Sequence, residues 1–160
     1  MRTLMASALF LPLALFADPT HAVKVHVSND TDSRMHFDTL TIGQDTRVVD
    51  YPREIIHGQH FPQEAVMLTS QSDRSAKSQM TYQFILPAEM CENGVTKCYE
   101  TVTLNWQTNM GTDGGDSSIC GVSGKNFEPL EKIRAYCNIP TIDPNDPSML
   151  HIHYHLDYAG

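Results

Sequence analysis

Hydrophobic and polar residues alternate along much of the chain in short runs. The run VKVHVSN places Val23, Val25 and Val27 on one face of an extended segment and Lys24 and His26 on the other. Successive side chains of a strand point to opposite faces, so this pattern predicts a strand with one buried face. The same alternation recurs in QMTYQFIL (79–86), ETVTLNW (100–106), EKIRAYC (131–137) and HIHYHL (151–156).

Turn-forming residues separate these runs, as in SNDTDS, YPRE, ENG and DPNDPS. Glycine, proline, asparagine and aspartate supply the backbone angles that tight turns require. No segment keeps helical periodicity over several turns. We therefore predict an all-β fold, a single β-sandwich domain of short antiparallel strands spanning residues 23–160.

Residues 1–22 have the features of a secretory signal peptide. Arg2 gives a positive start, an apolar run follows, and Ala22 ends THA, a plausible cleavage site. Asp18 and Pro19 end the apolar run, which is therefore too short to form a typical membrane-spanning helix. We expect a secreted or periplasmic protein.

The four cysteines agree with export, because an even set in an oxidising compartment is usually paired. All four lie in the second half of the chain, and three pairings are open to them. We favour Cys91–Cys98 around the Asn-Gly turn and Cys120–Cys137 between a glycine-rich loop and a strand. Zinc binding by these cysteines would call for paired C-x-x-C spacing, which the chain lacks.

The formal charge is −8, and removing residues 1–22 leaves it unchanged because Arg2 and Asp18 cancel. An acidic surface disfavours nucleic acid and anionic lipid. Neutral or zwitterionic lipid, carbohydrate and protein partners remain open.

The segment HIHYHL presents His151, His153 and His155 on one face of its predicted strand. Histidines in this spacing can hold zinc or copper if a neighbour adds a ligand, and His26 is that neighbour if the two terminal strands pair. The simpler interpretation is that the histidines form the solvent-facing polar face of the strand. Under this interpretation we expect neither a metal nor another cofactor. Metal binding is the alternative.

Other motifs offer little chemistry. Ser123 in GVSGK lacks the strand-to-helix context of a nucleophile elbow. The acidic loops 111–118 and 143–148 are ordinary Asx turns or, alternatively, calcium sites. Asn29 in NDT is a glycosylation acceptor only where the producing cell glycosylates. We therefore predict that the protein is not an enzyme.

Trp106 lies at a strand end and Met110 in the loop beyond it. Together they form a modest apolar patch for a ligand or a membrane, unless Trp106 packs in the core.

The order of several segments, VKVHVSNDTDSRMHF, PREIIHG, LTSQSDRS, MTYQF and TVTLNWQTNMG, resembles the aegerolysin-like family over about residues 23–120. The resemblance implies a small acidic β-sandwich that binds membrane lipid, in some members together with a perforin-like pore-forming partner. Of the family's features only the LNW strand, with Trp106 at its aromatic position, can be matched.

We therefore expect a secreted, non-enzymatic binding protein whose ligand is a neutral or zwitterionic membrane lipid. Two alternatives stay open. One is a periplasmic or extracellular protein that binds a protein partner, as an inhibitor or an immunity factor does. The other is a histidine-rich metal-binding β protein.

Overall fold

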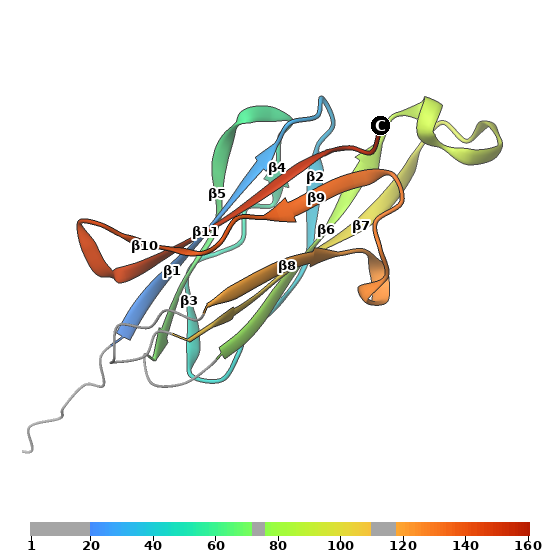
Figure 1. Ribbon diagram of the computed structural model, residues 1–160. Coiled ribbons are helices and arrows are strands. Elements are labelled where there is room, and N and C mark those ends of the chain that lie inside the picture. The colour runs from blue at the N-terminus through green and yellow to red at the C-terminus, as the bar shows by residue number, and fades with distance from the viewer. Residues whose placement is uncertain (1–19, 72–75, 110–117) are drawn as a thin grey trace, which may run out of the picture.

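The computed structural model describes residues 20–71, 76–109 and 118–160, which are almost entirely β-strand (Figure 1). In chain order the strands are β1 (Thr20–Asn29), β2 (Met35–Thr41), β3 (Thr46–Asp50), β4 (Ile55–Ile56), β5 (Gln59–Gln71), β6 (Ala76–Leu86), β7 (Cys98–Thr108), β8 (Ile119–Ser123), β9 (Ile133–Cys137), β10 (Thr141–Asp143) and β11 (Asp146–Tyr158). Short 3-10 turns are η1 (Ala88–Met90), η2 (Glu92–Gly94) and η3 (Lys125–Phe127).

Two sheets pack against each other, which confirms the predicted all-β sandwich. Sheet A has the order β10-β11-β1-β5-β3, and β9 also pairs with β11. Sheet B has the order β4-β2-β6-β7-β8. One pair departs from the antiparallel arrangement that we expected, because β1 runs parallel to β11 along most of its length. The first and last strands of the described chain therefore lie side by side at the centre of sheet A.

The core lies between the sheets and is built from the apolar faces that the alternation predicted. Val23, Val25 and Val27 of β1 are at most 1% exposed. Equivalent buried faces come from β6, β7 and β11, through Met80, Tyr82, Phe84, Leu86, Val102, Leu104, Trp106, Ile152, Tyr154 and Leu156. Burying these side chains is the main favourable contribution to folding.

Two disulfides lie in the second half of the chain, with the pairing that the sequence favoured. Cys91–Cys98 closes the short loop that contains η2, ahead of β7. Cys120–Cys137 joins β8 at the edge of sheet B to β9 of sheet A. The second bond therefore ties the two sheets together along one side of the sandwich.

Some sequence predictions fall at or beyond the limits of the described residues. β1 begins at Thr20, so the last residues of the predicted signal peptide continue the strand, and residues 1–19 lie outside the description. Met110 and the acidic loop 111–117 also lie outside it. Within the described ranges, no helix has the length and apolar character needed to cross a membrane.

Candidate functional site

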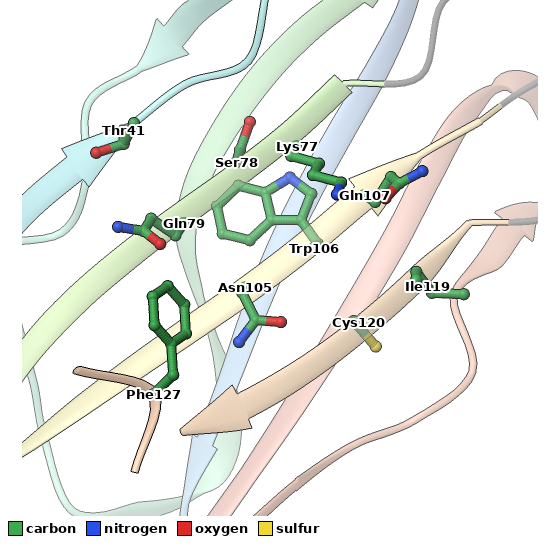
Figure 2. Close-up of a pocket in the computed structure, with 10 residues that line it drawn as sticks. All are labelled: Thr41, Lys77, Ser78, Gln79, Asn105, Trp106, Gln107, Ile119, Cys120 and Phe127. Carbon is green, nitrogen blue, oxygen red and sulfur yellow. The ribbon is translucent and has the colours of Figure 1, made fainter. Parts of the chain in front are cut away.

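Trp106, the predicted ligand-contacting residue, is only 3% exposed and belongs to the core. It also borders a pocket of about 560 Å³ over β6, β7 and β8 (Figure 2). The exposed aromatic at this pocket is Phe127 of η3, which is 73% exposed and holds a left-handed φ of 65°. The sequence carries no signal for Phe127, because a short 3-10 turn has no hydrophobic periodicity.

A histidine cluster forms on the outer face of sheet A, where β1 and β11 lie side by side. The parallel register sets Lys24 opposite His151 and His26 opposite His153. Side chains at these positions face away from the core, because their neighbours along each strand are the buried valines, isoleucines and leucines. The pairing of the first and last strands thus brings together histidines more than a hundred residues apart in the chain.

The nitrogens of His26, His151 and His153 lie within 4.8 Å of one another, one from each ring. His26 Nε2 is 3.1 Å from His151 Nδ1. Two nitrogens bound to one tetrahedral zinc at about 2.0–2.1 Å are roughly 3.3–3.4 Å apart. The closest pair is therefore already near the spacing that a shared ion requires.

The ring planes show which movement binding requires. The rings of His26 and His153 are stacked, with centroids 4.6 Å apart and planes 10° from parallel. An imidazole binds a metal through a lone pair in its ring plane, so stacked rings do not point at one ion. The rings of His26 and His151 are stacked as well, with centroids 5.3 Å apart and planes 22° from parallel. At least two of the three rings must therefore turn about their side-chain bonds, and all three are half-buried rather than locked in the core.

Asp143 of β10 orients His151. Its Oδ2 atom is 3.1 Å from His151 Nε2, so the carboxylate accepts a hydrogen bond from that nitrogen. A neutral His151 then has its lone pair on Nδ1, the atom that faces His26. In metal sites a ligating histidine usually donates its other ring N–H to a carboxylate in this way, which fixes its tautomer and orientation.

The electrostatics favour the uncharged imidazole at His26 and His153, which is the form that binds metals. Burial, followed by the neighbouring His153 and His151, lowers the pKa of His26 to about 4. Burial, followed by His151 and His155, lowers the pKa of His153. The backbone hydrogen bond from Asn145 and the bond from His151 lower the pKa of Asp143, so it stays a carboxylate.

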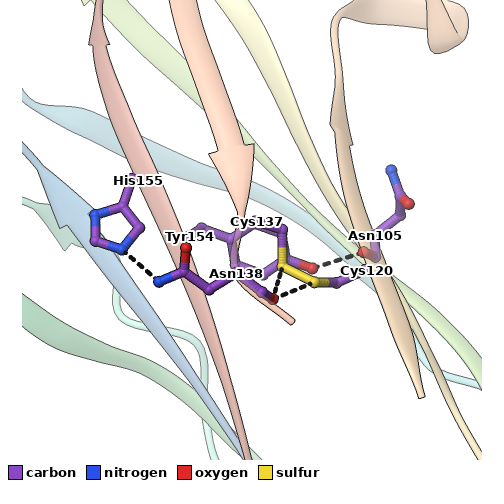
Figure 3. Close-up of a disulfide and its surroundings, with 6 residues drawn as sticks. All are labelled: Asn105, Cys120, Cys137, Asn138, Tyr154 and His155. Atoms are coloured by element: carbon purple, nitrogen blue, oxygen red, sulfur yellow. Dashed lines mark hydrogen bonds between the residues drawn. A yellow bond between two sulfur atoms is a disulfide. The ribbon is translucent and has the colours of Figure 1, made fainter. Parts of the chain in front are cut away.

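His155 lies outside this cluster, which corrects the predicted set of His151, His153 and His155. Its partner on β1 is Ser28 rather than a histidine. The ring instead stacks on Tyr136 of β9, with centroids 5.0 Å apart. Figure 3 shows its other contact, in which the Asn138 Nδ2 atom lies 3.1 Å from His155 Nε2. His26 takes the third position, as the sequence allowed if the terminal strands pair.

The NDT motif at Asn29 and the acidic 143–148 loop both form hydrogen bonds that hold local turns. Asn29 is fully buried, and its side-chain amide donates to the Ser33 carbonyl at 2.8 Å, so it does not present a glycosylation acceptor. In the 143–148 loop, Asp143 and Asp146 accept hydrogen bonds from the backbone nitrogens of Asn145 and Ser148. These are the Asx turns that the sequence predicted there.

Comparison with known families and curated proteins gives no match: no protein-family model matches the chain, and neither does a curated protein. The aegerolysin-like resemblance therefore remains a prediction.

Proposed function

We propose that this protein is exported and binds one transition-metal ion, zinc or copper, through His26, His151 and His153. The observation that carries the proposal is the set of three imidazole nitrogens within 4.8 Å on neighbouring strands. Imidazole suits both metals. A rigid sheet supports such a site, because the backbone positions of all three ligands are fixed by the β1–β11 ladder.

Three protein ligands leave one tetrahedral position for water or another ligand. The two disulfides fit the oxidising compartment in which an exported protein works. Such a protein would hold or carry an ion rather than need it to fold, since the core is complete without the cluster.

The test is calorimetric titration of zinc and copper into protein made without a histidine tag and freed of metal. We expect one ion per chain, and a loss of at least about tenfold in affinity when His26→Gln removes one ligand. His155→Gln is the matched control, because His155 lies on the same face of the same strand but outside the cluster. The proposal fails if no ion binds, or if both variants weaken binding equally.

A second candidate is binding of a neutral or zwitterionic lipid, which the aegerolysin-like resemblance implies. The exposed side chains of Phe127 and Ile119 beside the Trp106 pocket favour it. Co-sedimentation with phosphatidylcholine liposomes, with and without sphingomyelin and sterol, tests it. We expect binding that Phe127→Ser abolishes and Tyr51→Ser, at an 87% exposed aromatic elsewhere, leaves intact. Absence of binding to every liposome would exclude it.

A further inference from the structure

A second, polar pocket of about 850 Å³ shares no residue with the histidine cluster. Its walls come from the turn between β1 and β2, the start of β2, the turn between β4 and β5, and the segment just ahead of β7. Four basic side chains line it, namely Arg34, His36, His57 and Lys97.

The balance of charged side chains in this pocket, with Arg34 and Lys97 as its cations, differs from that of the whole chain. The chain has 11 lysines and arginines against 19 aspartates and glutamates, yet the only carboxylate among the lining residues is Asp32. Asp32 Oδ1 already accepts a 2.6 Å hydrogen bond from Tyr158 Oη. The pocket therefore has two cations, Arg34 and Lys97, against the one carboxylate of Asp32.

The two strongest cations of the pocket have no carboxylate partner within the described part of the chain. Arg34 is exposed and forms no ion pair there. Lys97 Nζ lies 5.7 Å from the centre of the Tyr99 ring, a cation–π contact that leaves the ammonium hydrogens available. Both groups can therefore take up an anion without first breaking an ion pair.

The walls are held in place before any ligand arrives. In the β1–β2 turn, Thr31 Oγ1 donates to Asn29 Oδ1 at 2.7 Å, and the Asn29 amide holds the Ser33 carbonyl. Gly58 packs so closely on this turn that an added Cβ would clash with the Thr31 carbonyl oxygen. A site whose walls are fixed loses less entropy when a ligand binds.

We propose that this pocket binds a small oxyanion of the phosphate or sulfate type. The Arg34 guanidinium offers the paired donors that match two oxygens of such an anion, and Lys97 adds a second positive charge. His36 and His57 add ring N–H donors. The charge of −8 repels extended polyanions, so a small anion fits this protein better than a nucleic acid or an anionic membrane.

The test follows backbone amide signals by NMR while inorganic phosphate, sulfate or glycerol phosphate is added to metal-free protein. The separate arms distinguish a free ion from a phosphate ester. We expect saturable shifts confined to residues 31–36, 57–58 and 96–97. Shifts that do not saturate, or that spread evenly over the basic residues of the surface, would overturn the proposal.

Variants separate specific binding from general charge. Arg34→Gln and Lys97→Gln should each weaken binding about tenfold, the loss expected for one charge-assisted hydrogen bond. Arg34→Lys keeps the positive charge but lacks the paired N–H donors of the guanidinium. We expect its anion affinity to lie between those of Arg34→Gln and the parent. Arg47→Gln, an exposed arginine of β3 outside the pocket, is the matched control. An equal loss in Arg47→Gln and Arg34→Gln would contradict the assignment.

Discussion

The Tyr154 hydroxyl of β11 donates a 2.6 Å hydrogen bond to the backbone carbonyl oxygen of Asn105 on β7. β11 belongs to sheet A and β7 to sheet B, so this bond crosses the core and links the two layers. The Tyr154 ring is fully buried, and burial raises the pKa of its phenol. The hydroxyl therefore stays protonated and keeps donating across the accessible pH range.

Tyr154→Phe tests this link between the sheets. The variant keeps the ring but leaves a buried carbonyl unpaired, so we expect the free energy of unfolding to fall by about 1–3 kcal/mol. Urea unfolding measures the change. Tyr136→Phe, at a tyrosine that is 55% exposed, is the matched control and should leave the midpoint almost unchanged. Equal midpoints for Tyr154→Phe and the parent would show that the bond contributes nothing.

The Cys120–Cys137 disulfide should stabilise the protein more than Cys91–Cys98. It closes a longer loop, with a sequence separation of 17 against 7. Loop-closure entropy predicts a loss of about 3 kcal/mol when both Cys120 and Cys137 become alanine, and roughly 2 kcal/mol for the Cys91 and Cys98 pair. Thermal unfolding of the two double variants gives the comparison. The reverse order would mean that effects other than loop closure dominate.

Asp143 should act as a positioning residue for the metal site. In Asp143→Asn the side chain keeps its shape but loses the charge that orients His151, so we expect zinc or copper affinity to fall about 10- to 100-fold. Calorimetric titration gives the affinity, and an unchanged stoichiometry would show that the ion still binds at the three histidines. Asp146→Asn, in the same hairpin but bonded to Ser148, should bind as the parent does. If Asp143→Asn binds the metal with unaltered affinity, Asp143 does not position His151 for metal binding.

The metal-free protein should lose stability in mild acid through His26. Burial holds the pKa of His26 at about 4 in the folded chain, against 6.5 as its ordinary value. Between these pH values His26 is protonated in the unfolded chain but not in the folded chain. The free energy of unfolding therefore falls as the pH drops from about 6.5 to 4, and His26 leaves it constant above that window. Because the side chain is half-exposed, we expect an effect of only about 1 kcal/mol.

Urea unfolding at pH 7 and pH 4.5 with a chelator present measures this loss. His26→Gln removes the titrating group and should make the difference between the two pH values smaller by that amount. If the parent and the variant lose the same free energy on acidification, His26 does not control this part of the acid response.

The sequence alone determined which face of each strand is buried. In β1 and β11 the residues at alternate positions, such as Val25 and Ile152, are apolar, and the structure places them at 0% exposure. A strand alternates its side chains by backbone geometry, so local order is sufficient to assign faces. For the disulfides the sequence left three pairings open, and the structure has the one that we favoured, Cys91–Cys98 and Cys120–Cys137.

Which strands are neighbours was decided only by the tertiary structure. The sequence named His151, His153 and His155 and offered His26 only if the terminal strands pair. The structure pairs these strands, brings His26 into the cluster, and places His155 against Asn138 instead. The pocket beside Trp106 and the basic pocket around Arg34 likewise combine segments that are distant in the chain. Pairing and register depend on long-range contacts among all the strands, and no local pattern of residues contains that information.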